Sequence, residues 1–390
     1  AKKTHRTLQD YFHPIAFIDH IRKISASLLD HPLVQRVLHK SGTLPDDLYE
    51  KLNKILTGET VLNKGASSDQ ADIARAIQRA LIYLSYPTGS SGSYGLDGDW
   101  GAGSNRGYAL FLREHAEEHL KDASEAVLDD SKLIYAATYI NAAQKTKEFA
   151  NIPVKKDGFE ALLNAIIDET KAENIYRKKE VYAIENLNQI DKKVFLSVKK
   201  IIENFRTEIQ AAADYGTSIG YAVKPQWIAA LARTETAGLP RPKYEHHWLY
   251  NHYSGTMAGG VKQGIKLSNF QECRFRSTSF GMGQLMGVEY KRLKDDSGNK
   301  LPNARAMYYL DVKTQFRVIV DFLKSKSGYT GVVLGLDCPD YDDYDEDEPT
   351  KAWKENSLHK CVYAYNGAAY LTNNYHINLS TYFKEAKDNW

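Results

Sequence analysis

Apolar residues recur every three or four positions along most of this chain, the spacing of an amphipathic helix. Residues 1–60 show it between turn signals at Ser41-Gly42 and Pro45, so we expect short helices there. Alternating apolar and polar residues, the pattern of a half-buried strand, are scarce, and at most a short hairpin is expected between 240 and 305. The pattern predicts a mainly α-helical protein.

Two further segments have clear helical patterns. From Asp69 onward, one face of a helix carries Ile73, Ile77, Leu81 and Leu84. A glycine- and serine-rich turn and a second helix follow. Later, a longer apolar stripe contains Ile184, Leu187, Val194, Val198, Ile201, Phe205 and Ile209. We interpret this stripe as a helix packed on a neighbouring domain, because its spacing drifts too much for a coiled coil.

The segment 225–237 carries the most unusual residue of the chain. Pro225 suits a first helical position, and Gly238 suits a residue just after a helix end. Glu235 falls seven positions after Ile228, so the pattern places a carboxyl on the apolar face. A carboxyl in apolar surroundings has a raised pKa, as a general acid requires. A glutamate that reaches water from the helix end is the alternative from spacing alone.

Composition narrows the classes of function. The chain has 390 residues, 43% hydrophobic and 26% charged, enough for two or three soluble domains. Its formal charge of +2 gives no field that favours nucleic acid or an anionic membrane as the main partner. The 26 tyrosines suit carbohydrate surfaces, although most aromatic residues pack in cores.

Targeting and disulfide signals are not visible. Cys273, Cys338 and Cys361 are odd in number and far apart, so we interpret them as free thiols. We find neither a signal peptide pattern nor a run of 18 apolar residues, and we expect no membrane insertion. A leader removed before Ala1 is left open.

The turn after residue 69, "YGLDGDWGAGSNRGYALF", resembles the peptidoglycan-binding domain of cell-wall hydrolases. The family pattern is an L-Q-x-x-L helix, a D-G-x-F-G-x-x-T turn and a second helix, and the resemblance covers 69–115. It implies cell-wall binding by Asp97, Gly98, Trp100 and Gly101. Ser104 in place of threonine and the Ser/Gly insertion at 88–93 depart from the family, so a small helical spacer is the alternative.

Four ordered motifs over about 155 residues resemble the N-acetylmuramidase domain of phage endolysins. They are "ETAG" from 235, "RPKYEHH" from 241, "STSFGMGQLMGVEYK" from 277 and "YNGAAY" from 365. The layout is also similar to goose-type lysozymes and lytic transglycosylases, in which a glutamate at a helix end faces a glycine–glutamine turn and a Tyr-Asn pair. Phe280 in place of tryptophan and Thr236-Ala237 in place of Ser-Gly are departures that affect the expected sugar subsites.

The resemblance implies a set of site residues. Glu235 is the general acid, and the glycine-rich turn approaches a glycan whose sugar ring or N-acetyl group Tyr365 and Asn366 hold. The expected substrate-binding residues are Ser279, Gly281, Gly283, Gln284, Met286, Tyr365, Asn366 and Gly367.

The mechanism depends on a second carboxylate, and Glu245 is the candidate in the matching motif. Glu245 could act as base, orient Glu235, or only pair with Arg241 or Lys243. Without a second carboxylate, Glu235 would act alone as acid and then base, and the product would be a 1,6-anhydro sugar.

No cofactor or metal is expected. His246, His247 and His252 lack an H-E-x-x-H pattern, which disfavours zinc. The acidic run 337–351 lacks the glycine of an EF-hand loop, so a solvated loop is expected and a calcium site is the alternative.

We expect three regions: a helical domain at 1–118, a helical middle segment at 119–220 and a lysozyme-like domain at 221–390. The expected function is cleavage of peptidoglycan glycan strands at the β-1,4 bond between N-acetylmuramic acid and N-acetylglucosamine, for cell lysis. A lytic transglycosylase, a secreted antibacterial effector with an immunity protein, and a non-catalytic wall-binding protein are the alternatives. The expected place of action is the periplasm, reached from the cytoplasm by holin release or, less favoured, by a secretion machine.

Overall fold

The structure, a computed structural model, does not describe every part of the chain. It describes residues 27–65, 67–86, 88, 95–115, 152–169, 179–191, 195–240, 242–244, 270–330, 362–363, 365–367 and 370–390.

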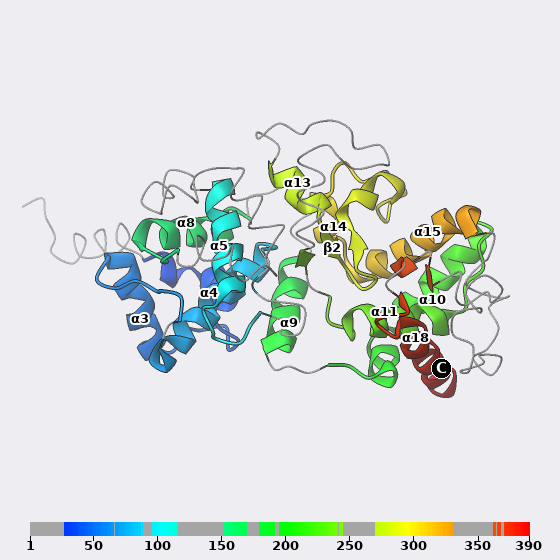
Figure 1. Ribbon diagram of the computed structural model, residues 1–390, viewed down its shortest axis with the longest axis horizontal. Coiled ribbons are helices and arrows are strands. Elements are labelled where there is room, and N and C mark those ends of the chain that lie inside the picture. The colour runs from blue at the N-terminus through cyan, green and yellow to red at the C-terminus, as the bar shows by residue number, and fades with distance from the viewer. Residues whose placement is uncertain are drawn as a thin grey trace, which may run out of the picture.

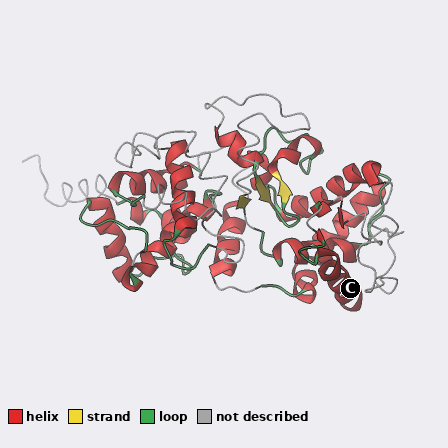
Figure 2. Ribbon diagram, viewed as in Figure 1, coloured by secondary structure: helices red, strands yellow, loops and turns green. Residues whose placement is uncertain are grey.

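The described chain is mainly helical, as its apolar spacing predicts (Figures 1 and 2). Its buried apolar residues form one cluster in the N-terminal part and two in the C-terminal part. We call residues 27–191 the N-terminal body and residues 195–390 the C-terminal half. In Figure 1 the N-terminal body lies on the left and the C-terminal half on the right, and α9, the last helix of the N-terminal body, lies at the border.

The N-terminal body consists of short and medium helices. They are η2 (Leu28–Asp30), α2 (Pro32–Leu38), α3 (Asp46–Thr57), η3 (Ser68–Gln70), α4 (Ala71–Tyr83), α5 (Ala102–His115), α8 (Lys156–Asp168) and α9 (Lys179–Asp191). The short helices expected before residue 60 are confirmed where the structure describes them.

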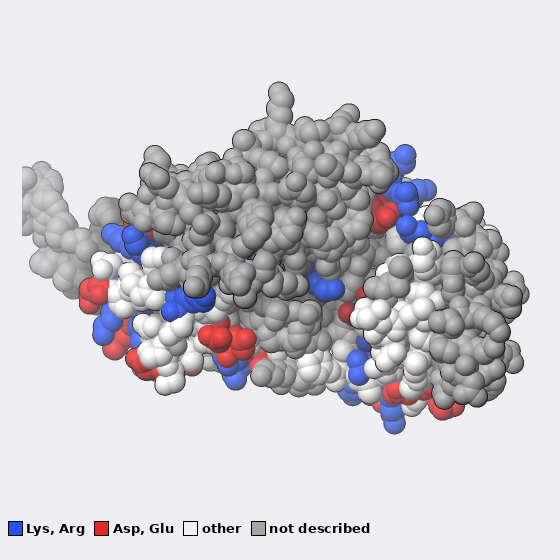
Figure 3. Space-filling view, in the orientation of Figure 1, with Lys and Arg blue, Asp and Glu red and all other residues white. Residues whose placement is uncertain are grey.

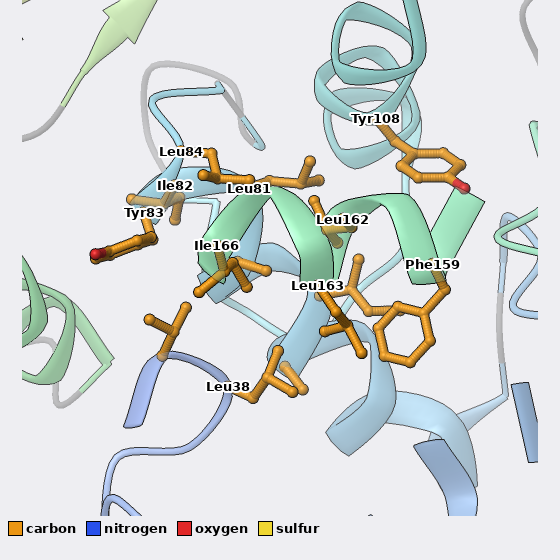
Figure 4. Close-up of a cluster of buried hydrophobic side chains, with 14 of the residues drawn as sticks. Leu38, Leu81, Ile82, Tyr83, Leu84, Tyr108, Phe159, Leu162, Leu163 and Ile166 are labelled. Atoms are coloured by element: carbon orange, nitrogen blue, oxygen red, sulfur yellow. The ribbon is translucent and has the colours of Figure 1, made fainter. Parts of the chain in front are cut away.

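Helix α4 is the centre of the N-terminal body. Ile73, Ile77 and Leu81 lie buried as their spacing predicts, and Figure 4 shows Leu81 beside Leu162 of α8. The polar side is buried as well. Arg79 is 1% exposed and donates through Nε to the Val37 carbonyl oxygen at 2.7 Å. A helix surrounded by neighbours needs such partners, because a buried polar group without a hydrogen bond is costly.

The C-terminal half contains longer helices and a small sheet. Its elements are α10 (Val198–Ser218), α11 (Pro225–Thr236), β1 (Lys243–Tyr244), α13 (Phe270–Arg276), β2 (Thr278–Phe280), β3 (Leu285–Met286), η7 (Gly287–Arg292), α14 (Arg305–Tyr308), α15 (Val312–Thr330) and α18 (Tyr375–Asn389).

The interpretation of the apolar stripe from Ile184 to Ile209 as one helix is wrong. Helix α9 ends at Asp191, and α10 begins at Val198, where Ser197 accepts a hydrogen bond from the Lys200 N–H at 3.2 Å. The two helices enter different cores. The described part of the segment 119–220 is therefore shared between two cores, and the domain limits themselves stay a prediction.

The sheet is antiparallel and small, with the order β1-β2-β3. Ser279 is paired with Lys243 on one side and with Met286 on the other. The expected short hairpin is β2–β3, and β1 adds a third strand. All three residues of β2 are buried, so the sheet is held by packing as well as by its few backbone hydrogen bonds.

Helix α11 packs against α10 and α18 in the core of the C-terminal half. Its residues from Trp227 to Ala232 are all buried, and the Trp227 ring stacks on Phe383 of α18 with 4.0 Å between ring centroids. Burying one such aromatic side chain contributes up to ~4–6 kcal/mol. The packing fixes both the position and the rotation of α11.

Charged side chains of both signs are interspersed on the described surface that Figure 3 shows. Within the described ranges, no helix has the length and apolar character needed to cross a membrane.

Gly238 is expected to tolerate alanine less well than Gly298. Both glycines have a positive φ, +71° and +83°, so alanine strains either backbone by roughly 1–2 kcal/mol. A Cβ at Gly238 would also lie 2.8 Å from side-chain carbons of Leu196 and Ile201, whereas nothing lies within 4 Å at Gly298. In urea unfolding, the free energy of unfolding of Gly238→Ala should be lower than that of Gly298→Ala by about 1–3 kcal/mol. Equal losses in the two variants would contradict the packing described here.

Candidate active site

Glu235 lies in the last turn of α11. The helix begins at Pro225 and ends at Thr236, which confirms the helix predicted from the sequence to within one residue. Ala237 and Gly238 are left-handed, with φ of 51° and 71°, and turn the chain away from the helix axis. Glu235 is half-buried, whereas the preceding turns of α11 are enclosed in the core. The carboxyl therefore stands at the boundary between core and surface.

The hydroxyl of Tyr375 donates a hydrogen bond to Oε1 of Glu235. Tyr375 is the first residue of α18 and is 6% exposed. Because α11 and α18 pack together along their length, the phenol is fixed relative to the carboxyl. This hydrogen bond orients the carboxyl group.

The segment Gly281–Gln284, which we call the glycine turn, is the tight turn between β2 and β3. Gly281 and Gln284 have φ of 72° and 46°. The Gln284 amide is folded back over the turn: Nε2 donates to the Gly281 carbonyl oxygen at 3.2 Å, and Oε1 accepts from the Ser279 hydroxyl at 3.0 Å. These bonds account for the left-handed backbone of a residue that is not glycine, since they offset its strain.

Tyr365 holds the middle of this turn. Its hydroxyl donates to the Gly283 carbonyl oxygen at 2.6 Å. A Cβ at position 283 would lie 2.7 Å from that hydroxyl oxygen and 2.7 Å from Cγ1 of Ile319. Gly283 is thus needed for close packing of the turn on α15 and Tyr365.

Thr236 connects the end of α11 to the same turn. Its hydroxyl donates to the Ala232 carbonyl oxygen at 2.8 Å and is 3.5 Å from the Met282 carbonyl oxygen. The C-terminal end of α11, the glycine turn, Tyr365 and the start of α18 therefore come together around Glu235.

The two tyrosines share an electrostatic environment. Burial, and next the Glu235 carboxyl, raise the pKa of Tyr365 well above its ordinary value. The same two causes, in the same order, raise the pKa of Tyr375. Both phenols therefore stay protonated at neutral pH and remain available as hydrogen-bond donors.

The other expected substrate-binding residues fall close to this group. Met286 is the β3 partner of Ser279 and is half-buried, as are Asn366 and Gly367, which directly follow Tyr365. Gly367 has a φ of 78°, and its N–H donates to the Tyr363 carbonyl oxygen at 2.8 Å. Their roles in substrate binding stay predictions.

Several candidates lie outside the described residues. They are Glu245, His246, His247, His252, Cys338, Cys361 and the acidic run 337–351. Within the described ranges, no three His, Cys, Asp or Glu side chains gather in a way that could hold a metal ion.

The turn expected to bind the cell wall is organised by Gln78 of α4, which is fully buried. Gln78 Nε2 donates to Asp97 Oδ1 at 2.9 Å and to the Ser104 hydroxyl at 2.9 Å, and Oε1 accepts from the Gly98 N–H at 2.9 Å. Ser104 thus has a hydrogen-bonded place in the turn although it departs from the family's threonine. Through these bonds to Gln78, Asp97 and Gly98 help to close the turn.

Trp100 of the same turn is 0% exposed and meets Tyr108 edge to face, with centroids 6.0 Å apart. Its ring is part of the core rather than of an open surface. Gly101, next to it, is half-buried just before α5. Sugar binding by this turn stays a prediction.

Tyr375 was missed by the sequence analysis. It lies within "NNYHINL", ten positions after Tyr365, and only the packing of α18 on α11 brings it to Glu235. A polar aromatic residue at the first position of an apolar helix is the one local signal that could have drawn attention to it.

The family comparison matches residues 244–387 to the model described as Muramidase: N-acetylmuramidase. The matched segment begins in β1, after α11 and Glu235, and it includes β2, β3, the glycine turn, Tyr365 and Tyr375. The match supports a muramidase family, a glycoside hydrolase activity and peptidoglycan as the substrate. No curated protein and no solved structure matches the chain.

Tyr375→Phe is expected to alter the pH dependence of glycan cleavage. The substitution keeps the ring but removes the donor to Glu235, so the carboxylate is less stabilised. A hydrogen bond to a charged group contributes roughly 1.5–3 kcal/mol, and losing it should raise the pKa of the carboxyl by about one to two units. The alkaline limb of the pH–rate profile should therefore move to higher pH.

Tyr382→Phe is the matched control. Tyr382 lies on the same helix, and its ring is 4.7 Å from the guanidinium carbon of Arg233. An unchanged alkaline limb in Tyr375→Phe, or an equal shift in both variants, would contradict the role given to Tyr375.

Proposed function

We propose that the protein hydrolyses the β-1,4 bond between N-acetylmuramic acid and N-acetylglucosamine in peptidoglycan, with Glu235 as the general acid. The observation that carries this proposal is the meeting of Glu235 with Tyr375 and the Tyr365-bound glycine turn, in a chain whose C-terminal part matches an N-acetylmuramidase family.

In the proposed reaction, the Glu235 carboxyl transfers its proton to the glycosidic oxygen while the bond between that oxygen and the muramic C1 breaks. A water molecule then supplies hydroxide to C1, and its remaining proton returns to the Glu235 carboxylate or passes to a second carboxylate. The leaving sugar gains a hydroxyl, and one water is consumed. Glu245 is proposed as the second carboxylate because of its place in the matching motif.

The glycine turn is proposed to face the sugar rings. Gly281 is half-buried and has no side chain to keep a ligand from its backbone, and an amide such as that of Gln284 has the chemistry that an N-acetyl group requires. Asn366 and Gly367 are proposed to complete the same subsite beside Tyr365. Small residues next to one amide suit a flat pyranose ring.

The N-terminal turn around Asp97 is proposed to bind the cell wall. Its target would be peptidoglycan outside the cytoplasm, reached by holin release after phage infection, with export by a secretion machine and a cognate immunity protein as the other route. Cell lysis is the proposed outcome of cleavage.

Glu235→Gln is expected to lower the rate of sacculus digestion by about 10²- to 10⁴-fold, because the amide is too weak an acid to transfer a proton to the leaving oxygen. The measurement is dye release from labelled sacculi. Glu203→Gln is a suitable control, since Glu203 pairs with Lys200 on the surface of α10 at 2.8 Å. A folded Glu235→Gln protein with the parental rate would remove Glu235 from the mechanism.

The products are expected to carry reducing muramic acid ends. Mass spectrometry of digested sacculi separates the two reactions, because a hydrolysis product is heavier by one water, about 18 Da, than the 1,6-anhydro product of Glu235 acting alone. Only anhydro products would identify a lytic transglycosylase and contradict hydrolysis. A Glu245→Gln variant with unchanged rate would separately exclude Glu245.

A further inference from the structure

A buried ion pair joins the N-terminal body to the segment that carries the glycine turn. Arg274 of α13 donates through Nε to Oε1 of Glu114 on α5, and through Nη2 to Oε2 at 3.2 Å. The two residues are 160 positions apart in the sequence. Figure 1 shows α13 at the border between the two halves, on the side of α5.

The pair is almost completely shielded from water. The Arg274 side chain is 1% exposed and that of Glu114 is 2% exposed. Nη1 of Arg274 donates to the Ser85 carbonyl oxygen at 2.9 Å, and Tyr86 donates its hydroxyl to Glu114. The guanidinium carbon also lies over the rings of Tyr86 and Phe275, at 4.1 and 4.3 Å from their centroids. Such an ion pair fixes geometry, because the loss of either residue takes two charge-assisted hydrogen bonds from the buried charge of the other.

Short contacts connect the Arg274–Glu114 ion pair with the glycine turn. The Thr278 hydroxyl donates to the Arg274 carbonyl oxygen at 2.7 Å, and Thr278 opens β2. On the other strand, Gly287 follows β3 and packs so tightly that a Cβ there would lie 1.9 Å from the Phe275 carbonyl oxygen. Both strands that hold the turn therefore rest on the last residues of α13.

Further contacts between the halves lie on α14 and beside it. The Tyr308 hydroxyl donates to the Ile82 carbonyl oxygen at 3.1 Å, and Arg305 donates to Glu169 at 2.7 Å. The Tyr309 hydroxyl also donates to Glu169. The N-terminal body thus contacts the sheet-bearing part of the C-terminal half through several partly buried polar groups.

We propose that Arg274, held by Glu114, is a positioning residue for the glycine turn, so that the N-terminal body sets the geometry of the active site in addition to any wall binding. This inference rests on the proposed function for its effect on catalysis. Glu114 touches no substrate in this scheme. It acts through Arg274, α13 and the two strands that flank the turn.

Glu114→Gln and Tyr86→Phe test the proposal. Glu114→Gln keeps the size of the side chain but removes the charge opposite Arg274, whereas Tyr86→Phe removes only one hydroxyl that holds Glu114. Asp191→Asn is the matched control: Asp191 is a 3% exposed carboxylate that pairs with Arg79 at 3.1 Å inside the same N-terminal body, on helices distant in sequence from α13. All proteins are compared at a temperature at which circular dichroism shows them folded.

Two readouts are needed. The first is hydrogen exchange of the backbone amides in 278–286, which does not depend on enzymatic activity. Glu114→Gln should increase exchange there about 10-fold or more, Tyr86→Phe less, and Asp191→Asn should leave it as in the parent. The second is cleavage of soluble glycan fragments, in which kcat should fall about 10- to 100-fold in Glu114→Gln with KM within about twofold, because a small misplacement of catalytic groups acts on the chemical step.

The outcomes separate the two proposals. Parental exchange and parental kcat in folded Glu114→Gln, or in Tyr86→Phe if the former does not fold, would overturn the positioning role. Equal effects in Asp191→Asn would also overturn it, since general loss of stability would then be the cause. If Glu114→Gln shows increased exchange at 278–286 relative to the parent, but the parent itself cuts no glycan, the positioning role is retained and the proposed function is refuted.

Discussion

The left-handed end of α11 is the constraint on which the candidate site depends. Ala237 and Gly238 reverse the chain directly after the turn that carries Glu235, and the Ala237 carbonyl oxygen accepts the Leu196 N–H at 3.0 Å. Gly238 packs against Leu196, and Leu239 enters the core of the N-terminal body. Glu235 is therefore anchored where two cores meet, and a shift between them would move its carboxyl.

Two tyrosine hydroxyls fix the other parts of the candidate site. Tyr365 uses its hydroxyl on a backbone carbonyl of the turn, and Tyr375 uses its own on the carboxyl of Glu235. Each interaction satisfies a polar group that burial would otherwise penalise, and each fixes one side of the site with a rigid ring. The two tyrosines, which follow α15 in the sequence, thus complete a site whose turn and glutamate lie earlier in the chain.

The parts of this structure that depend on local spacing could be predicted, and those that depend on distant packing could not. Pro225, the apolar period of α11 and Gly238 are local signals, and they located the helix of Glu235. The stripe from Ile184 to Ile209 has helical spacing, but Ser197 caps a new helix within it, and spacing alone does not show which core each half enters. The partners of Tyr375 and of the Glu114–Arg274 pair cannot be assigned from local spacing, because tertiary packing alone brings these residues together.

The sequence distance between Glu114 and Arg274 has a consequence for how the chain folds. Contacts between residues 160 positions apart close a long loop, and the chain loses the entropy of that loop before it gains the contact, so we expect such contacts to form late in folding. Because the N-terminal segments leave the ribosome first, most of the N-terminal body can assemble before α13 exists. The sheet and its turn would then pack on an N-terminal body that is already folded, so the first part of the chain would guide the folding of the active-site segment.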